Sequence, residues 1–164
     1  MRRGAGAVVV GALDREGGLD VRALDAWRRA AGDATMVFHR AIDTLADPAS
    51  VVDELLGHGV DRILTSGGAM RSIDGADVLA DLVGAADGRL RIVAGGGVRV
   101  HDIPALCAMG VDAVHLSAKR PSGDASASGP GGGDPGYDVT DGTVVARAAA
   151  ALRSLGRGER LTDA

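Results

Sequence analysis

The sequence predicts an α/β fold with a parallel sheet, because short apolar strands alternate with helical segments five times. Each predicted strand is a nearly continuous run of Val, Leu, Ile and Ala, which is typical of strands buried on both faces. Two architectures fit this alternation. A doubly wound five-stranded parallel sheet is complete with five strands, whereas a (β/α)₈ barrel needs eight repeats and typically about 250 residues. The length of 164 residues alone favours the doubly wound sheet.

The predicted strands span residues 7–13, 35–39, 60–65, 90–94 and 111–117. Helix-start signals separate them. Asp20 is a suitable N-cap for a first helix, and Pro48 suits the first position of a second. Asp74 or Gly75 opens a third helix, and a short helix is expected at 100–109. The stretch Thr140-Asp141-Gly142 caps a final helix that reaches about Leu155.

We expect one domain over residues 1–156. Within it, residues 121–136 are rich in Gly, Ser and Pro and contain no apolar anchor, so they are predicted to form a flexible loop. Residues 157–164 are predicted to be a loose tail.

The amino-acid composition argues against several classes of function. Net charge is -4 and only 2% of residues are aromatic, which argues against a nucleic-acid partner. No apolar run approaches the roughly 20 residues of a membrane span, so no membrane partner is expected. Cys107 is the one cysteine, so no disulfide can form within the chain. These features indicate a cytoplasmic protein.

Candidate catalytic residues follow the second strand, because chemistry in α/β proteins collects at the C-terminal ends of parallel strands. His39 can act as an acid, a base or a metal ligand, and Arg40 can bind a carboxylate or phosphate. Asp43 could orient either residue, or could simply pair with Arg40 to fix the loop. His39 and Arg40 are adjacent, so in a regular strand they point to opposite faces.

Candidate anion-binding residues follow the other strands. Glycines at strand ends let backbone N–H groups approach an anion, although a tight turn needs glycine equally. His115 shares a strand face with Ser117, which makes it a further catalytic candidate, or alternatively a buried structural histidine. The anion-binding candidates are Ser66, Gly67, Gly95, Gly96, Gly97 and Ser117.

Taken in order and spacing, five stretches resemble the CutC family of copper homeostasis proteins. The stretches are GALD at 11–14, FHRAID at 38–43, ILTSG at 63–67, AGGGV at 94–98 and VHLSA at 114–118. The resemblance covers about residues 8–118. It implies a (β/α)₈ fold, of which this sequence looks like the fourth to eighth units. The implied fold class is an incomplete TIM barrel of five parallel βα units.

The resemblance also implies a role in copper homeostasis, with copper ion binding in the cytoplasm. Family cysteines proposed to bind copper lie in the strands that this sequence lacks, which leaves His39 and His115 as metal candidates. Two alternatives stay open: a TIM-barrel enzyme acting on a small phosphorylated or carboxylated substrate, and a truncated inactive fragment. An incomplete barrel exposes strand edges, so a homo-oligomer that covers them is also expected.

Overall fold

The computed structural model describes residues 4–122 and 137–156. Its main sheet has five parallel strands in the order β1-β2-β3-β4-β5, which is also their order along the chain. The five strands are β1 (Ala7–Val10), β2 (Thr35–Phe38), β3 (Arg62–Thr65), β4 (Arg91–Gly95) and β5 (Ala113–His115).

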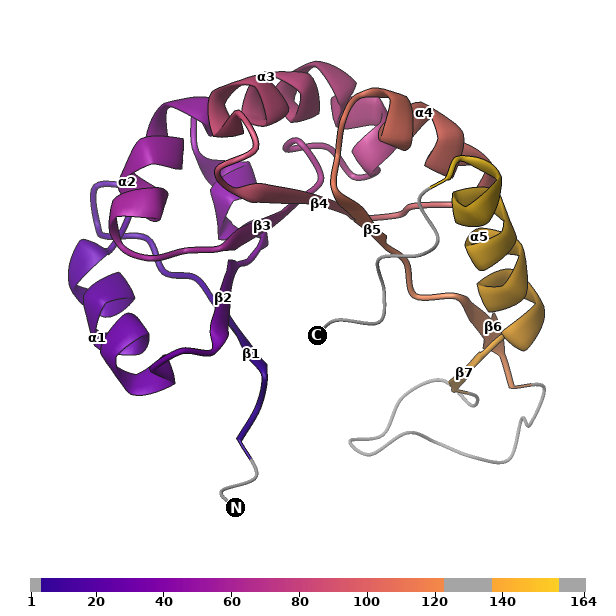
Figure 1. The fold of residues 1–164 in the computed structure, drawn as a ribbon, viewed down its shortest axis with the longest axis horizontal. Helices are drawn as coiled ribbons and strands as arrows, with labels where there is room; N and C mark the ends of the chain where they lie inside the picture. The colour runs from indigo at the N-terminus through magenta and orange to yellow at the C-terminus, as the bar shows by residue number, and fades with distance from the viewer. Residues whose placement is uncertain (1–3, 123–136, 157–164) are drawn as a thin grey trace. The chain divides into compact units, whose positions relative to one another are not determined.

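Four α-helices lie along the outer, convex side of this curved sheet (Figure 1). They are α1 (Val21–Ala31), α2 (Val52–Gly57), α3 (Ala76–Ala86) and α4 (Ile103–Ala108). A doubly wound sheet carries helices on both faces and reverses its strand order at a switch point. Among the described residues neither occurs, so the doubly wound alternative is wrong. The fold class predicted from the family resemblance, an incomplete barrel of five parallel βα units, is confirmed.

Single turns of 3₁₀-helix complete the connections between strands and helices. They are η1 (Arg40–Thr44), η2 (Ala49–Val51), η3 (Ser72–Gly75) and η4 (Val100–Asp102). Three of them directly precede α2, α3 and α4, so α2 and α4 begin later than predicted. Gly75 is the N-cap of α3, as one of the two predicted starts of that helix. Asp20 caps α1 as predicted, because its carboxylate accepts a hydrogen bond from the Ala23 N–H at 3.0 Å.

The core lies between the sheet and the convex layer of helices. Alternate strand residues are buried there, as the pleat requires: Met36 and Phe38 on β2, Ile63 on β3 and Ile92 on β4. Cys107 on α4 is also buried, as a small apolar side chain. The helices contribute the fully buried residues Leu24, Leu55, Leu79, Leu82 and Leu106.

The described residues fall into two compact units that divide between His115 and Leu116. In the second unit, β6 (Lys119–Pro121) pairs antiparallel with β7 (Asp138–Thr140), and α5 (Gly142–Ser154) follows with Asp141 as its N-cap. Placing Pro121 in a flexible loop was therefore wrong, because it ends a strand. The rest of that loop, 123–136, and the tail, 157–164, lie outside the described residues. The single domain over 1–156 stays a prediction.

Candidate functional site

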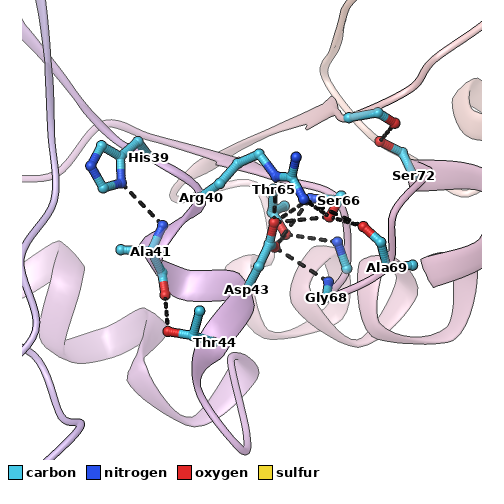
Figure 2. Close-up of polar contacts among 12 residues, drawn as sticks. His39, Arg40, Ala41, Asp43, Thr44, Thr65, Ser66, Gly68, Ala69 and Ser72 are labelled. Carbon is cyan, nitrogen blue, oxygen red and sulfur yellow. Dashed lines mark hydrogen bonds and ion pairs between the residues drawn. The ribbon is translucent and has the colours of Figure 1, made fainter.

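Arg40 and Asp43 form the base of a polar cluster at the C-terminal end of β2. The strand stops at Phe38, and η1 begins at Arg40, so the two residues lie one 3₁₀ turn apart. Their side chains therefore share a face, and Arg40 Nε donates to Asp43 Oδ2 at 2.7 Å. Figure 2 shows both side chains reaching toward the loop that follows β3.

Asp43 is the centre of the cluster, with its carboxylate only 7% exposed. Oδ1 accepts hydrogen bonds from Thr65 Oγ1 at 2.5 Å, from the Ser66 N–H at 3.1 Å and from the Gly68 N–H at 3.3 Å. Oδ2 accepts from Arg40 Nε, from Ser66 Oγ at 2.9 Å and from the Ser66 N–H at 3.1 Å. Burial raises the pKa of Asp43, but the hydrogen bonds from Thr65, Arg40 and Ser66 outweigh burial and lower it overall.

Arg40 is held rigidly but keeps one nitrogen for other partners. Its Nη2 donates to Ser66 Oγ at 2.7 Å and to the Ala69 carbonyl at 3.4 Å. Nη1 makes no hydrogen bond within the described residues, and the side chain is 46% exposed. This nitrogen lies over Gly96, where an added Cβ would stand only 3.2 Å from it. Gly96 also has a φ of 140°, which favours glycine, so residue 96 both permits the turn and leaves room for the guanidinium.

A second set of contacts joins the loops after β3 and β4. The Gly96 carbonyl accepts hydrogen bonds from Ser72 N–H at 2.8 Å and Ser72 Oγ at 3.1 Å. Asp102, only 5% exposed, accepts from the Arg99 N–H and from Arg71 Nη2. Burial raises the pKa of Asp102, but these hydrogen bonds and the Arg71 charge lower it overall. The two loops are thus fixed to each other beside the Arg40 cluster.

The two candidate histidines lie apart from Arg40 and from each other. His39 Nδ1 accepts a hydrogen bond from the Ala41 N–H at 3.0 Å, and its ring points away from the guanidinium (Figure 2). The ring packs on Gly11, where an added Cβ would lie 2.4 Å from it. His115 is exposed on β5, and strands β3 and β4 separate it from His39. The side chains of His39 and Arg40 therefore point in different directions, as predicted. The cause is the start of η1 at Arg40 and not a strand that continues through both residues.

The structure brings together four of the predicted site residues: Arg40, Asp43, Ser66 and Gly96. The other glycines differ in exposure, since Gly67 and Gly95 are buried and Gly97 is exposed. Ser117 belongs to the second unit, where its side chain is exposed.

Sequence reasoning missed Thr65, Arg71 and Asp102. Thr65 precedes Ser66 at the end of β3, so its place at a strand end was an available signal. Asp102 stands three residues after Arg99, at the N3 spacing of a capping box, and its carboxylate indeed accepts the Arg99 N–H. No sequence signal pairs Arg71 with Asp102, because 31 positions separate them.

A metal centre would need several converging ligands. In the part of the chain that the structure describes, no group of three or more His, Cys, Asp or Glu side chains converges on a point. Over the same residues, no helix combines the length and apolar character needed to cross a bilayer.

Comparison with known proteins gives a consistent result. The model of the CutC family matches residues 1–120. A CutC family protein from Xanthomonas axonopodis pv. citri (strain 306) is 41% identical over 120 residues, which cover 73% of this chain and 50% of the relative. One from Treponema denticola is 37% identical over 118 residues, covering 71% of this chain and 48% of the relative. The chain thus spans about half the length of the curated relatives it matches.

A solved structure resembles the chain over a similar extent. The crystal structure of the putative copper homeostasis protein CutC from Streptococcus agalactiae aligns with a TM-score of 0.63 and 30% sequence identity. The alignment covers 67% of this chain and 55% of that one. Sequence and structure comparisons therefore agree on one family.

Proposed function

Because the chain belongs to the CutC family, we propose that it acts in copper homeostasis in the cytoplasm and that the Arg40 cluster binds a small anionic molecule. The first part is supported by the description of the Streptococcus agalactiae relative as a putative copper homeostasis protein. A single cysteine, which cannot form a disulfide within the chain, supports the reducing compartment. The second part rests on the geometry of the cluster.

One observation carries the anion proposal: Arg40 is fixed in place, its side chain is about half-exposed, and Nη1 makes no hydrogen bond within the described residues. Asp43 and Ser66 hold the other side of the guanidinium, so little conformational entropy is lost when an anion binds to Nη1. The N–H groups of Nη1 can donate charge-assisted hydrogen bonds to a carboxylate or a phosphate while Nε and Nη2 stay bound to Asp43 and Ser66. A small phosphorylated or carboxylated molecule therefore fits this site, although the rings of His39 and His115 lie apart from Arg40 and so offer it no acid or base there.

The anion proposal is tested by calorimetric titration of the purified chain with inorganic phosphate and with acetate. We expect Arg40→Gln to weaken binding at least tenfold. Arg89→Gln is the matched control, because Arg89 pairs with the exposed Asp53, on the helical side of the fold, and should leave binding unchanged. Equal binding by wild type and Arg40→Gln would reject the site, and no binding by wild type would favour an inactive fragment.

Direct copper binding by His39 and His115 is a separate prediction, and the geometry fits it poorly. Because His39 Nδ1 accepts the Ala41 N–H, the neutral ring carries its proton on Nε2. A copper ion at Nε2 would move that proton to Nδ1 and break the cap of η1. His115 is three strands away, so the two rings do not form a ready-made pair.

Copper titration of wild type, His39→Ala and His115→Ala tests this prediction directly. Tight uptake that is lost in either variant would establish a histidine ligand. Absence of tight copper uptake by wild type would reject direct copper binding by this chain. It would not affect the anion proposal, because Arg40 takes no part in the proposed copper binding.

A further inference from the structure

The ring of His39 lies apart from Arg40, yet it is held in one orientation. Its Nδ1 accepts a hydrogen bond from the Ala41 N–H at 3.0 Å, so His39 is the N-cap of η1 (Figure 2). The backbone of His39 is extended, with φ −83° and ψ −172°, as a residue that precedes a helix usually is. The His39 N–H donates to the Val10 carbonyl at 2.8 Å and so continues the pairing of β2 with β1. His39 therefore marks the point at which the strand ends and η1 begins.

Gly11, directly after β1, leaves the space that this ring occupies. A Cβ added to Gly11 would collide with Nδ1 and Cε1 of His39, and its three nearest neighbours are all atoms of that ring. The φ of Gly11 lies outside the left-handed region, so its backbone conformation does not require glycine. The missing side chain at residue 11 thus serves the imidazole.

The element that His39 caps carries the two charged residues of the candidate site. Arg40 and Asp43 stand three positions apart on η1, and one turn of 3₁₀-helix places their side chains on the same face. Their 2.7 Å ion pair therefore needs η1 to be formed from its first residue. Asp43 is also held by Thr65 and Gly68 of the neighbouring loop. Arg40 is the residue next to the cap, so loss of the cap should affect Arg40 most.

We infer that His39 is a positioning residue: through the cap of η1 it holds the Arg40 guanidinium in the orientation that leaves Nη1 available to an anion, and Gly11 makes room for it. The role needs the acceptor atom at Nδ1 and no acid–base chemistry. A shorter side chain with an acceptor can therefore replace the histidine, whereas a ring without an acceptor cannot. The effect on anion binding rests on the proposed function; the effect on Arg40 does not.

Three variants of the full chain separate these requirements. His39→Phe keeps a ring in the space beside Gly11 but removes the acceptor. His39→Asn supplies an acceptor of the kind that N-caps favour. Gly11→Ala displaces the ring and leaves its chemistry unchanged.

The first measurement is solvent exchange of the Arg40 Nε–H by NMR, because this group donates to Asp43. Its signal is identified by its absence in Arg40→Gln. Exchange should be roughly fivefold faster in His39→Phe and in Gly11→Ala, as the loss of a typical N-cap predicts, and close to wild type in His39→Asn. Exchange that His39→Phe leaves unchanged, or that His39→Asn raises equally, would overturn the inference.

The second measurement is calorimetric titration with inorganic phosphate. The Kd should rise about threefold in His39→Phe and in Gly11→Ala, because a less ordered Arg40 loses more conformational entropy on binding. Adding Gly11→Ala to His39→Asn should change the Kd little, since the shorter side chain leaves the space beside residue 11 empty. His58→Phe is the matched control, because His58 pairs with Asp25 on the helical side of the fold.

The two measurements distinguish failure of the inference from failure of the proposed function. If wild type binds no phosphate while the exchange of Arg40 changes as expected, the anion site is rejected and the positioning role stands. If wild type binds phosphate and His39→Phe binds it equally well, His39 does not position the site. Circular dichroism checks that each variant folds, and Gly11→Ala decides the question should His39→Phe fail to fold.

Discussion

Replacing Asp43 with Asn tests whether one carboxylate holds the loops after β2 and β3 together. The amide keeps one acceptor oxygen and turns the other into an NH₂ donor. In one orientation, the NH₂ group faces Arg40 Nε and the Ser66 donors. In the other, it faces the donors of Thr65, Ser66 and Gly68. Either way, donors that are largely buried lose their acceptor.

The expected cost follows from these contacts. A hydrogen bond to a charged group contributes about 1.5–3 kcal/mol, and a buried polar group left unpaired costs about 1–3 kcal/mol. Since Asp43 is nearly buried and also pairs with Arg40, we expect Asp43→Asn to lower the free energy of unfolding by about 3–5 kcal/mol. That is a large part of the roughly 5–15 kcal/mol that stabilises a typical domain.

Urea denaturation followed by far-UV circular dichroism measures this change. Asp53→Asn is the control, because Asp53 is 80% exposed and its pair with Arg89 should be worth about 0–1 kcal/mol. A loss below about 1 kcal/mol in Asp43→Asn, similar to the control, would refute the reasoning, because it would mean that the network does not hold the loops.

Three further outcomes are expected. The pKa values of Asp43 and Asp102 are lower in the folded state than the reference 3.8. The ionised carboxylates therefore stabilise the folded state above pH 3.8, and this stabilisation is lost as the pH falls through the folded-state pKa values. The urea concentration at the unfolding midpoint should fall across this pH range, and it should fall less in Asp43→Asn. Gly96→Ala should cost about 1–3 kcal/mol and displace Arg40, because it combines a φ of 140° with a contact 3.2 Å from Nη1; unchanged phosphate binding would contradict this. Asp141→Ala should lower the stability of α5 by about 1 kcal/mol, because it removes the acceptor of two N-terminal N–H groups; the helical circular dichroism signal on heating measures it.

The sequence predicted the main sheet well because each strand is a dense apolar run and because polar, glycine or proline residues stand between the strands and most of the helices. Length alone pointed to the wrong architecture, since a doubly wound sheet and a partial barrel share the same local pattern. The difference lies in strand order and in which faces carry helices, and neither is encoded within a single βα unit. The family resemblance supplied that information.

The candidate site was predicted in part for a similar reason. Arg40 and Asp43 are three residues apart, so their pairing could be read from spacing. The hydrogen bonds that Asp43 accepts from Thr65 and Gly68 could not be predicted from spacing, because they depend on how closely two loops approach after folding. The pairing of β6 with β7 was also missed, since Lys119–Pro121 has no apolar alternation and 16 residues stand between it and its partner strand.

Because the strands pair in the order in which they occur, each strand of the main sheet pairs only with the strands before and after it. Stability is then close to a sum of unit terms and nearest-neighbour terms, as in repeat proteins. A βα unit can be added or removed at either end of the sheet without changing how the central strands pair. Unfolding should start at β1 and β5, which have one neighbour each, and the amide protons of β3 should exchange last with deuterated solvent.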